Sequence, residues 1–388
     1  MAFDWLGRSL RDRAQEGYLR TRHCQHYEKD AVINIDGDHY LNFASNDYLG
    51  MRQNQSVLQA WVEGLAQFGG GSGGSPLVTG YSQAHLALEA WLADKLQREA
   101  VLLFNSGFAA NQAICQALFA SGGDIVADKL MHASFIDGAL SSDATLTRFS
   151  HNDVTHADKR LHAASHADKL LASEGVFSMD GDTAPVAELS QLAARHDAWF
   201  MLDDAHGFGV LGENGLGTAE AAGLAHTDVP VLMATFGKAI GTGGAFIAGS
   251  QVLIDYLINH ARHYIYSTAM PPAQAIATLS SLTCLEDGSA RAALHENIRY
   301  FRQRAQECGL SLMDSDSAIQ PIVIGDPKRA VAMSEAVRRR GIWVTAMRHP
   351  TVPKGTDRLR ITLSALHQTQ DIDVLCDALM LSAGEVSP

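Results

Sequence analysis

Cysteine residues and long apolar runs are both scarce in this sequence. Its 388 residues include five cysteines, which lie far apart and form no C-x-x-C pair. That spacing excludes a disulfide framework and a cysteine-based zinc site, so we expect no metal and a reducing, cytoplasmic setting. No apolar run approaches the ~18 residues of a membrane span, so no membrane partner is expected. The first residues carry charges from Asp4 onward and lack the apolar core of a secretory signal.

Basic residues are outnumbered by acidic ones. Lys and Arg total 30 against 43 Asp and Glu, which gives a formal net charge of -13. Binding to nucleic acid phosphates requires a basic surface, so nucleic acid is excluded as a main partner. A small anionic ligand in a local basic pocket stays compatible with this charge. Hydrophobic residues make up 46% of the chain, which is typical of an ordinary globular protein with a large core.

Short apolar runs alternate with helical patterns through the middle of the chain. This alternation predicts an α/β fold with a mostly parallel sheet that helices cover on both faces. The apolar runs cover residues 100–104, 124–127, 144–149, 169–173, 199–204, 229–236 and 244–250.

The pattern of apolar and polar residues divides the chain into three parts. Residues 1–45 form an N-terminal segment, which begins with an amphipathic helix that places Phe3, Leu6 and Leu10 on one face and continues with two strands around the turn at Asp36. Residues 46–285 form a large domain that ends in a helical region. Residues 286–388 form a smaller α+β domain, whose strands are expected at 318–325, 342–347 and 358–363.

The sequence HADK occurs at His156 and again at His166, and in the same polar stretch between two strands His162 and His166 lie four residues apart. On a helix they would share one face, which is a possible zinc arrangement. A charged, solvated helix face explains the same stretch without a ligand, and we favour that interpretation.

Lysine is rare, and only one of the eight lysines has an apolar, glycine-rich setting. Lys238 lies in VLMATFGKAIGTGG, directly after an expected buried strand. Partial desolvation there would favour the neutral amine, which is a nucleophile. A structural lysine whose side chain extends from a strand end to solvent would have the same setting.

Two further strand ends carry polar groups. The run WFMLDDAHG ends in Asp203 and Asp204, followed by His206. A carboxylate buried at the carboxyl end of a parallel strand needs a cationic partner such as a protonated pyridine, although Asp204 could serve a turn or helix cap. The run LLFNSGFAAN leads through Gly107 into a helix, whose first amides could bind phosphate or be capped by Asn105 or Ser106.

One glycine pattern points to a different class of protein. The sequence GFGVLG at residues 207–212 matches G-x-G-x-x-G after a strand, as in nicotinamide-dependent oxidoreductases. A dinucleotide site needs a helix that begins at the last glycine, and the following ENGLGTAEA does not predict one. The glycine-rich GGGSGGS near residue 70 also lacks the Lys-Ser/Thr of a P-loop.

These motifs, in this order, resemble the α-oxoamine synthase family of fold-type I pyridoxal phosphate (PLP) enzymes. The resemblance covers nearly the whole chain, and it is carried by LNFASNDYLG, FGGGSGGSPLVTGYSQAH, SGFAANQA, HASFIDG, SEGVFSMDGD, LDDAHGFGV, TFGKA, ARHYIYSTAMPPAQA, SAIQPIVIGD and TVPKGTDRLRITL. It implies a PLP-dependent transferase with a seven-stranded, mostly parallel sheet, a smaller C-terminal domain and an N-terminal helical segment.

The resemblance also implies the activity. The member that this chain is most similar to condenses L-alanine with a pimeloyl thioester, with loss of carbon dioxide, in biotin synthesis. Coenzyme A and acyl carrier protein both remain open as carriers of the acyl group. A family member that uses glycine and acetyl-CoA is the nearest alternative, and the oxidoreductase is a remote one.

The family's residue roles carry over by position. Lys238 would bind the cofactor covalently, Asp203 would pair with its ring nitrogen, His206 would bind its phenolic oxygen, and His132 would stack on its ring. The remaining cofactor contacts would be Gly107, Phe108, Thr235, Ser178 and, from the neighbouring subunit of a homodimer, Ser267 and Thr268. Arg360 would bind the amino acid carboxylate, and Arg20, Asn46, His132 and Thr351 would lie near the substrates.

Three positions depart from the family's common pattern. Phe208 stands where a small residue is usual, Ile240 replaces a common Phe, and Pro76 stands where Arg is frequent. None of them removes a chemical group that the reaction needs. Phe208 and Pro76 could alter the surroundings of the acyl chain or thioester.

Overall fold

The computed structural model describes residues 2–386 and divides the chain into two compact units. Unit 1 comprises Met1–Tyr48, Ser178–Asp182 and Ala292–Pro388, and unit 2 comprises Leu49–Phe177 and Thr183–Arg291. The N-terminal segment therefore belongs with the C-terminal residues, whereas the sequence suggested a separate part. The short segment 178–182 also joins unit 1, which no local sequence pattern indicates.

A seven-stranded sheet forms the centre of unit 2, as expected from the apolar runs. Its order is β4-β10-β9-β8-β7-β5-β6, and only β10 runs antiparallel to its neighbours. All seven expected strands are present: β4 (Ala100–Phe104), β5 (Asp124–Asp128), β6 (Thr145–Phe149), β7 (Lys169–Glu174), β8 (Trp199–Asp203), β9 (Val231–Thr235) and β10 (Ala245–Gly249).

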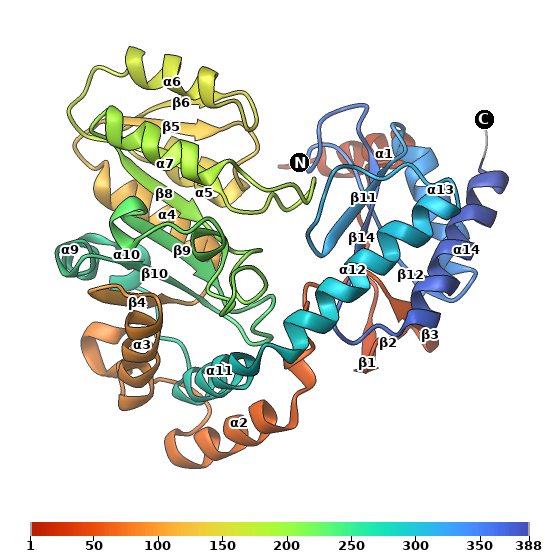
Figure 1. Cartoon of the computed structure of the whole chain (residues 1–388), viewed down its shortest axis with the longest axis horizontal. Coiled ribbons are helices and arrows are strands. Elements are labelled where there is room, and N and C mark those ends of the chain that lie inside the picture. Colours follow the sequence, from red (N-terminus) through yellow and green to blue (C-terminus); the bar gives the residue numbers. More distant parts are fainter. Residues whose placement is uncertain (1, 387–388) are drawn as a thin grey trace. The chain divides into compact units, whose positions relative to one another are not determined.

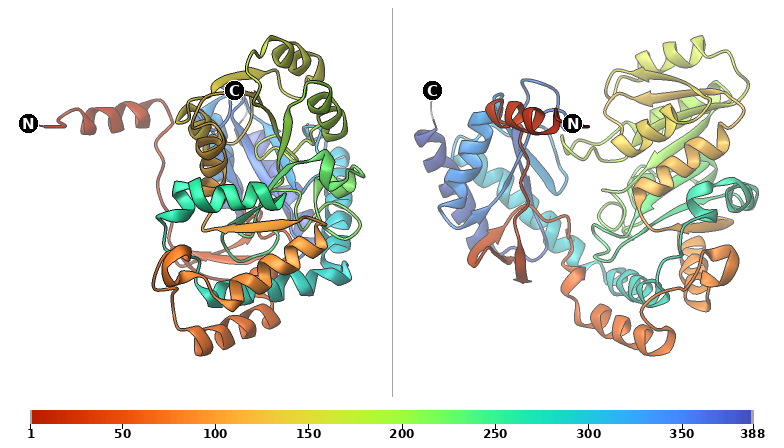
Figure 2. Two further views of the ribbon diagram at one scale, coloured as in Figure 1. Left: turned by 90° about the vertical axis from the view of Figure 1, so that its left-hand side faces the viewer. Right: turned by 180° about the vertical axis from the view of Figure 1, so that it is seen from behind.

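Helices cover both faces of this sheet (Figure 1, and seen from behind in Figure 2). On one face α6 (Val154–Ala163) and α7 (Val186–Arg195) contact each other and the central strands. On the other face α4 (Gly107–Leu118) packs against β9 and β10 and against α5 (Ala133–Leu140). Because both faces are covered, the inner strands are largely apolar, and Ile125, Ala172 and Met201 are fully buried. The edge strand β6, with the sequence TLTRF, is more exposed.

Unit 2 has further elements outside this sheet and the helices named above. They are η1 (Met51–Gln53), α2 (Gln55–Phe68), η2 (Pro76–Gly80), α3 (Gln83–Lys95), α8 (Thr218–Ala221), η3 (His226–Asp228), α9 (Gln251–His260), α10 (Arg262–Ile265), α11 (Pro272–Cys284) and η4 (Leu285–Asp287). The helical region breaks near residues 267–272 and 288, as expected, and also at Ala261. Helix α12 (Ser289–Glu307) leads into unit 1.

Unit 1 contains two small sheets. One has the order β1-β2-β3-β12 and consists of β1 (Gln25–Lys29), β2 (Val32–Ile35), β3 (Asp38–Asn42) and β12 (Ile342–Trp343). The other has the order β11-β14-β13 and consists of β11 (Ile319–Val323), β13 (Thr345–Met347) and β14 (Arg358–Thr362). Helices α1 (Leu6–Gln15), α13 (Pro327–Arg338) and α14 (Thr369–Glu385) complete the unit.

Two sequence-based expectations about helices and strands need correction. The single strand expected at 342–347 is two strands, because Ile342 pairs with β3 and Thr345 pairs with β14. His162 and His166 do not share a helix face, because α6 ends at Ala163 and His166 lies beyond it, with Nδ1 2.9 Å from Asp124 Oδ2.

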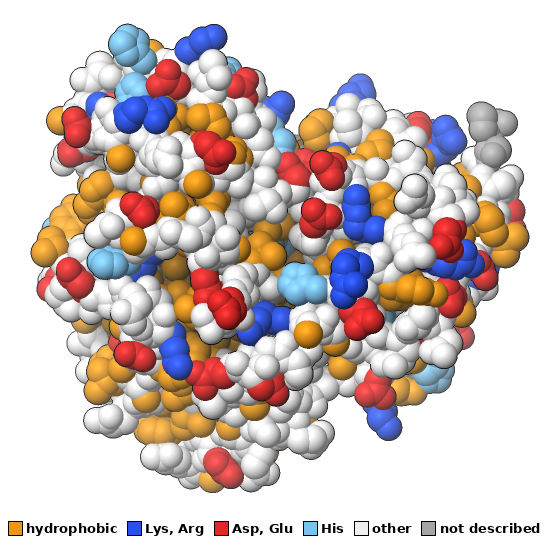
Figure 3. Space-filling view, in the orientation of Figure 1, with side chains coloured by type: hydrophobic (Ala, Val, Ile, Leu, Met, Phe, Trp, Pro, Cys, Tyr) orange, Lys and Arg blue, Asp and Glu red, His pale blue; other side chains and the backbone are white. Residues whose placement is uncertain are grey.

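The surface carries both signs of charge. Figure 3 shows acidic and basic side chains interspersed over the face turned to the viewer, with apolar side chains between them. Among the described residues, no helix combines the length and apolar character that crossing a membrane requires.

Candidate active site

Most of the proposed cofactor residues follow strands of unit 2 at one edge of the sheet. Strands β5, β8 and β9 run parallel, and β4 runs in the same direction because both β4 and β9 pair antiparallel with β10. Their carboxyl ends therefore share an edge, where ligands of open α/β sheets bind. The loops at this edge carry Gly107, His132, Asp203, His206 and Lys238.

The two neighbouring aspartates at the end of β8 have different surroundings. Asp203 is 4% exposed; its Oδ2 accepts a hydrogen bond of 2.8 Å from Asn111 Nδ2, and its Oδ1 accepts one of 3.2 Å from Ala205 N. Asp204 is fully buried and accepts hydrogen bonds from Thr218 N (2.6 Å) and Thr218 Oγ1 (2.5 Å). Burial raises the pKa of Asp204 to about 6. Asp204 therefore stabilises the segment that follows β8. This is the structural role, in a turn or helix cap, that the sequence left open for it.

His132 is the N-cap residue of α5. Its Nδ1 accepts a hydrogen bond of 3.2 Å from Ser134 N and lies 2.7 Å from Ser134 Oγ. Burial lowers the pKa of His132, the charge of Asp203 opposes this shift, and the charge of Lys238 adds to it. The imidazole thus lies within electrostatic range of both groups that the cofactor chemistry needs. His206 is also buried, in the turn that follows Asp203.

Lys238 is half-buried in the tight turn after β9. Its neighbours Phe236, Ala239 and Ile240 are buried. Gly241 N donates to the Lys238 carbonyl over 2.9 Å and closes the turn. Gly241 has φ +72°, and a Cβ there would lie 2.4 Å from Arg52 N, so only glycine fits this close approach.

The start of α4 offers backbone N–H groups. Ser106 is the N-cap, and its Oγ accepts from Ala109 N over 3.2 Å, which confirms the capping interpretation. The amides of Gly107 and Phe108 precede the intrahelical ladder, where a helix start favours an anion. A Cβ on Gly107 would lie 3.9 Å from Thr235 Cβ and 3.9 Å from Met233 Cε, which are ordinary van der Waals distances. Thr235 therefore lies beside the start of α4.

The segment that contains Ser267 and Thr268 is held by its own chain. Asn105 Nδ2 donates to the Thr268 carbonyl over 2.6 Å, Ser72 Oγ donates to Ala269 O over 2.7 Å, and His85 Nε2 lies 2.8 Å from Met270 O. Thr268 thus lies beside the residues that precede α4.

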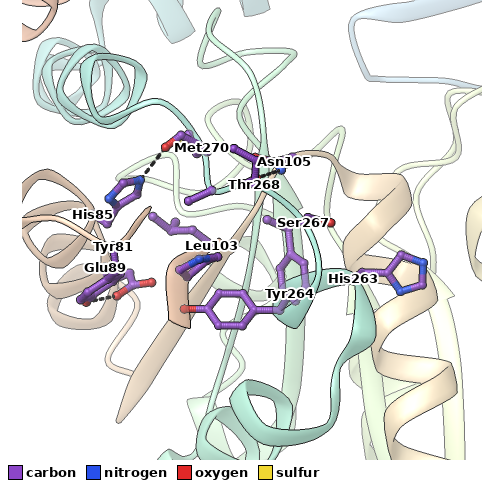
Figure 4. A pocket seen from close by; sticks show the side chains of 13 residues that line it. Tyr81, His85, Glu89, Leu103, Asn105, His263, Tyr264, Ser267, Thr268 and Met270 are labelled. Atoms are coloured by element: carbon purple, nitrogen blue, oxygen red, sulfur yellow. Dashed lines mark hydrogen bonds between the residues drawn. The ribbon is translucent and has the colours of Figure 1, made fainter. Parts of the chain in front are cut away.

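A small cavity lies against this segment (Figure 4). Its volume of about 20 Å³ is roughly that of one water site. Tyr81 donates to Glu89 over 2.6 Å at its wall, and Figure 4 shows this pair on the same side as His85. Burial raises the pKa of Glu89 to about 7.

Five of the proposed residues belong to unit 1 and form two groups. Arg360 is 4% exposed; its Nε donates to the Ser178 carbonyl over 2.7 Å, and its Nη1 donates to Asn46 Oδ1 over 3.1 Å. Arg20 Nη2 donates to Thr351 Oγ1 over 3.1 Å, and this pair is exposed. Residues more than 300 positions apart in the chain are thus brought into contact in both groups.

Sequence reasoning missed two buried residues beside Asp203. Asn111 on α4 donates to both Asp203 and Ser134, and Ser134 on α5 contacts His132. The only signal in the sequence is an amide inside the apolar helix SGFAANQA, and nothing there pairs it with a residue 92 positions away.

The departures from the family pattern lie in packed positions or at the surface. Phe208 is 2% exposed and packs edge-on against Phe246, with ring centroids 5.1 Å apart. Ile240 is fully buried. Pro76 begins η2 and lines the small cavity described above. The bulk of Phe208 therefore serves the core of unit 2.

Comparison with known proteins decides the family. The family model named aminotransferase class I and II matches residues 38–379. The chain belongs to this family. Its relatives include the 8-amino-7-oxononanoate synthase of Aeromonas hydrophila, which is 48% identical over 96% of this chain and 94% of the relative. The synthase of the same name from Marinomonas sp. is 48% identical over 97% and 94%.

A solved structure supports the fold and the cofactor. Serine palmitoyltransferase from S. paucimobilis, which carries a bound aldimine of PLP and myriocin, matches with a TM-score of 0.93 and 29% identity over 99% of this chain and 98% of that one. The resemblance expected from the motifs, the α/β fold and pyridoxal phosphate as the cofactor are therefore confirmed. No helix begins at Gly212, and α8 starts only at Thr218, so the dinucleotide motif is a coincidence of turn glycines.

Proposed function

We propose that this protein condenses L-alanine with a pimeloyl thioester to give 8-amino-7-oxononanoate, carbon dioxide and a free thiol, in biotin synthesis. The relatives that share this name support the substrates. The observation that carries the chemistry is the convergence of Asp203, His132 and Lys238 at one sheet edge. The acyl group arrives on coenzyme A or on acyl carrier protein.

The residues of unit 2 fit pyridoxal phosphate. The amides of Gly107 and Phe108 at the start of α4, with Thr235 beside them, would hold its phosphate. Asp203 would accept the ring N–H, His206 would bind the phenolic oxygen, and His132 would stack on the ring. Ser178, which belongs to unit 1, is assigned to this oxygen by the family resemblance alone. Lys238 would attach the cofactor covalently. When bound, the cofactor supplies a sink for the electrons released at the amino acid α-carbon.

The side chains then divide the work of the reaction. The guanidinium of Arg360 binds the carboxylate of alanine, with Asn46 beside it. The Lys238 amine removes the proton from the alanine α-carbon and later returns a proton there. Asp203 keeps a proton on its ring partner throughout, because a buried carboxylate is stable only beside a positive charge or strong donors. Arg20 and Thr351, which are hydrogen-bonded to each other, contact the acyl substrate.

We further propose a homodimer whose neighbouring subunit supplies Ser267 and Thr268 to the phosphate. One face of α2 packs on α11, where a Cβ on Gly64 would lie 2.7 Å from Ala273 Cα. The same helix exposes Leu58, Val62 and Leu65 along one side. Such clustered apolar exposure is typical of an interaction surface. In ultracentrifugation, Val62→Arg should weaken the dimer, whereas Leu140→Arg, at an exposed apolar position on α5, should not. Equal sedimentation of both variants and wild type as monomers would contradict the dimer.

Free-thiol release tests the proposed reaction. The purified protein is given pimeloyl-CoA with L-alanine and, separately, acetyl-CoA with glycine. We expect release with the first pair only and a product with the mass of 8-amino-7-oxononanoate. Release with the second pair only would keep the cofactor chemistry and overturn the substrates. If neither pair reacts, pimeloyl-acyl carrier protein is the remaining donor, and no release from it either would refute the proposal.

A further inference from the structure

A chain of buried hydrogen bonds joins two of the proposed cofactor residues. Asn111, 1% exposed on α4, donates from Nδ2 to Asp203 Oδ2 over 2.8 Å and to Ser134 Oγ over 3.0 Å. Ser134 Oγ lies 2.7 Å from His132 Nδ1. These hydrogen bonds therefore connect His132 through Ser134 and Asn111 to Asp203, and all four residues belong to unit 2.

The orientation of the Asn111 amide follows from its partners. A carboxylate only accepts hydrogen bonds, so the group that faces Asp203 must be the NH2. Both N–H bonds of Nδ2 are then used, one on Asp203 and one on Ser134. The Asn111 Oδ1 is buried and accepts no hydrogen bond from the described residues. An unpaired buried acceptor costs about 1–3 kcal/mol, which indicates that the two donated bonds serve a purpose beyond stability.

The proton positions further along the chain follow from the same reasoning. Ser134 Oγ accepts from Asn111, so its own hydroxyl hydrogen is available to donate to His132 Nδ1. Ser134 N also donates to this Nδ1 over 3.2 Å. A nitrogen that accepts two hydrogen bonds carries no proton, so the neutral imidazole holds its proton on Nε2.

Close packing of α4 on α5 holds Asn111 and Ser134, the two donors of these hydrogen bonds, next to each other. A Cβ on Gly138 would lie 2.8 Å from Gln112 Cα, so α5 approaches α4 within backbone distance just after Asn111. Ser134 lies one turn before Gly138 on the same helix. The glycine thus allows the approach that brings Ser134 Oγ to Asn111.

We propose that Asn111 is a positioning residue that orients the Asp203 carboxylate for the ring nitrogen and, through Ser134, fixes His132 as a neutral imidazole with its proton on Nε2. The role of Asn111 toward Asp203 rests on the proposed function, and the tautomer of His132 does not. With its proton on Nε2 and its Nδ1 already accepting two hydrogen bonds, His132 can donate a hydrogen bond from Nε2 and cannot act as a general base. The charged groups that act on His132 are Asp203, Lys238 and Asp137.

Nuclear magnetic resonance of [15N]histidine-labelled protein tests the tautomer without any turnover. The His132 signals are assigned by their loss in His132→Asn. We expect long-range 1H–15N correlations of a neutral Nε2–H imidazole in wild type at pH 7. An Nδ1–H pattern, or a charged imidazole at this pH, would overturn the proposal whether or not the Asn111 and Ser134 variants fold.

A double-mutant cycle tests the relay itself. In Asn111→Leu the Ser134 hydroxyl loses the hydrogen bond that it accepts and becomes free to accept one from Nδ1–H of a charged imidazole, so the pKa of His132 should rise by about one pH unit. In a Ser134→Ala background the same change should produce less than half of that rise. Equal rises in both backgrounds would mean that the change acts on His132 without Ser134 and would refute the relay.

Gln112→Leu is the matched control, because it makes the same kind of change at the next residue of α4. It should shift the pKa of His132 less than Asn111→Leu does. In the cofactor-loaded enzyme, Asn111→Ala should slow exchange of the alanine α-proton by about 10- to 100-fold, and Gln112→Leu should leave it near the wild-type rate. Normal exchange in Asn111→Ala, with the tautomer confirmed, would refute only the Asp203 half.

Discussion

Replacement of Asp203 by asparagine isolates the charge at the end of β8. The side chain keeps its shape and its place, 4% exposed, between Asn111 Nδ2 and Ala205 N. The new side-chain amide has one oxygen, whereas the carboxylate accepts hydrogen bonds from both Asn111 and Ala205. Its NH2 group therefore faces one of these donors, unless the Asn111 side chain turns away. We expect a loss of folding free energy of about 1–3 kcal/mol, measured by urea unfolding, because one buried donor loses its acceptor.

The catalytic effect should be larger than the stability effect. The proposed ring N–H has a negative partner in wild type and a neutral one in Asp203→Asn. Removing one partner of a buried ion pair costs about 3–5 kcal/mol, and each ~1.4 kcal/mol is tenfold in rate. If this cost falls on the step that removes the alanine α-proton, the step slows by about 10²- to 10⁴-fold.

Exchange of the alanine α-proton with deuterated water measures this step without an acyl donor. The control is Asp143→Asn, an exposed carboxyl of the same unit, which should exchange at the wild-type rate. The cofactor content of each protein is measured from its absorbance, so that weak binding is not mistaken for slow chemistry. Exchange in Asp203→Asn within tenfold of wild type, at equal cofactor content, would refute the assigned role of Asp203.

Three further changes test other parts of the account. Lys238→Ala should reduce thiol release to about 10⁻³ of wild type or less, with an unchanged circular dichroism spectrum. Lys129 is an exposed lysine after β5, and the control Lys129→Ala should stay active. Substantial turnover in Lys238→Ala would exclude Lys238 as the proton-transfer group. Arg360→Ala should raise the KM for alanine by about 10- to 100-fold and leave that for pimeloyl-CoA little changed, with Arg360→Lys in between; equal effects on both substrates would argue against a carboxylate site. Glu89 has a folded-state pKa of about 7, above its ordinary 4.5, so the folded protein holds the Glu89 proton more tightly than the unfolded chain does. Its contribution to the folding free energy is complete below pH 4.5 and is lost as pH rises through 7. Between pH 5.5 and 8.5, wild type should therefore lose about 2 kcal/mol more folding free energy than Glu89→Gln in urea unfolding, and parallel pH profiles would show that Glu89 is not buried as described.

The large sheet was predictable because its strands are buried on both faces. Such strands are continuous apolar runs, which remain visible in the sequence without knowledge of their neighbours. Strand β1 was missed because its residues QHYEK are largely polar and exposed. The division of residues 342–347 into β12 and β13 was missed because it depends on which strands lie beside them, β3 for one and β14 for the other.

The candidate site was predictable where chemistry follows a strand end. Lys238 and Asp203 each stand directly after an apolar run, so their types and places already indicate a function. Asn111 and Ser134 were not predictable in this way, because each is one polar residue among small residues of a helix. Their role depends on the packing of α4 on α5 and on a partner far away in the chain.

The amphipathic N-terminal segment was foreseen as a helix, but the structure does not bury its apolar face. Helix α1 begins at Leu6 and has no buried residue, and Leu6 and Leu10 are both at least half exposed. Periodicity predicts a helix with two faces and does not say what covers the apolar one.

Reduction with borohydride followed by peptide mass analysis tests the central claim most directly, that Lys238 holds pyridoxal phosphate. The reagent fixes a cofactor bound to a lysine as a stable adduct, and digestion then reports which lysine carries it. The account predicts the phosphopyridoxyl mass on the peptide that contains Lys238. An adduct on any of the other seven lysines, or none in protein that shows full thiol release, would contradict it.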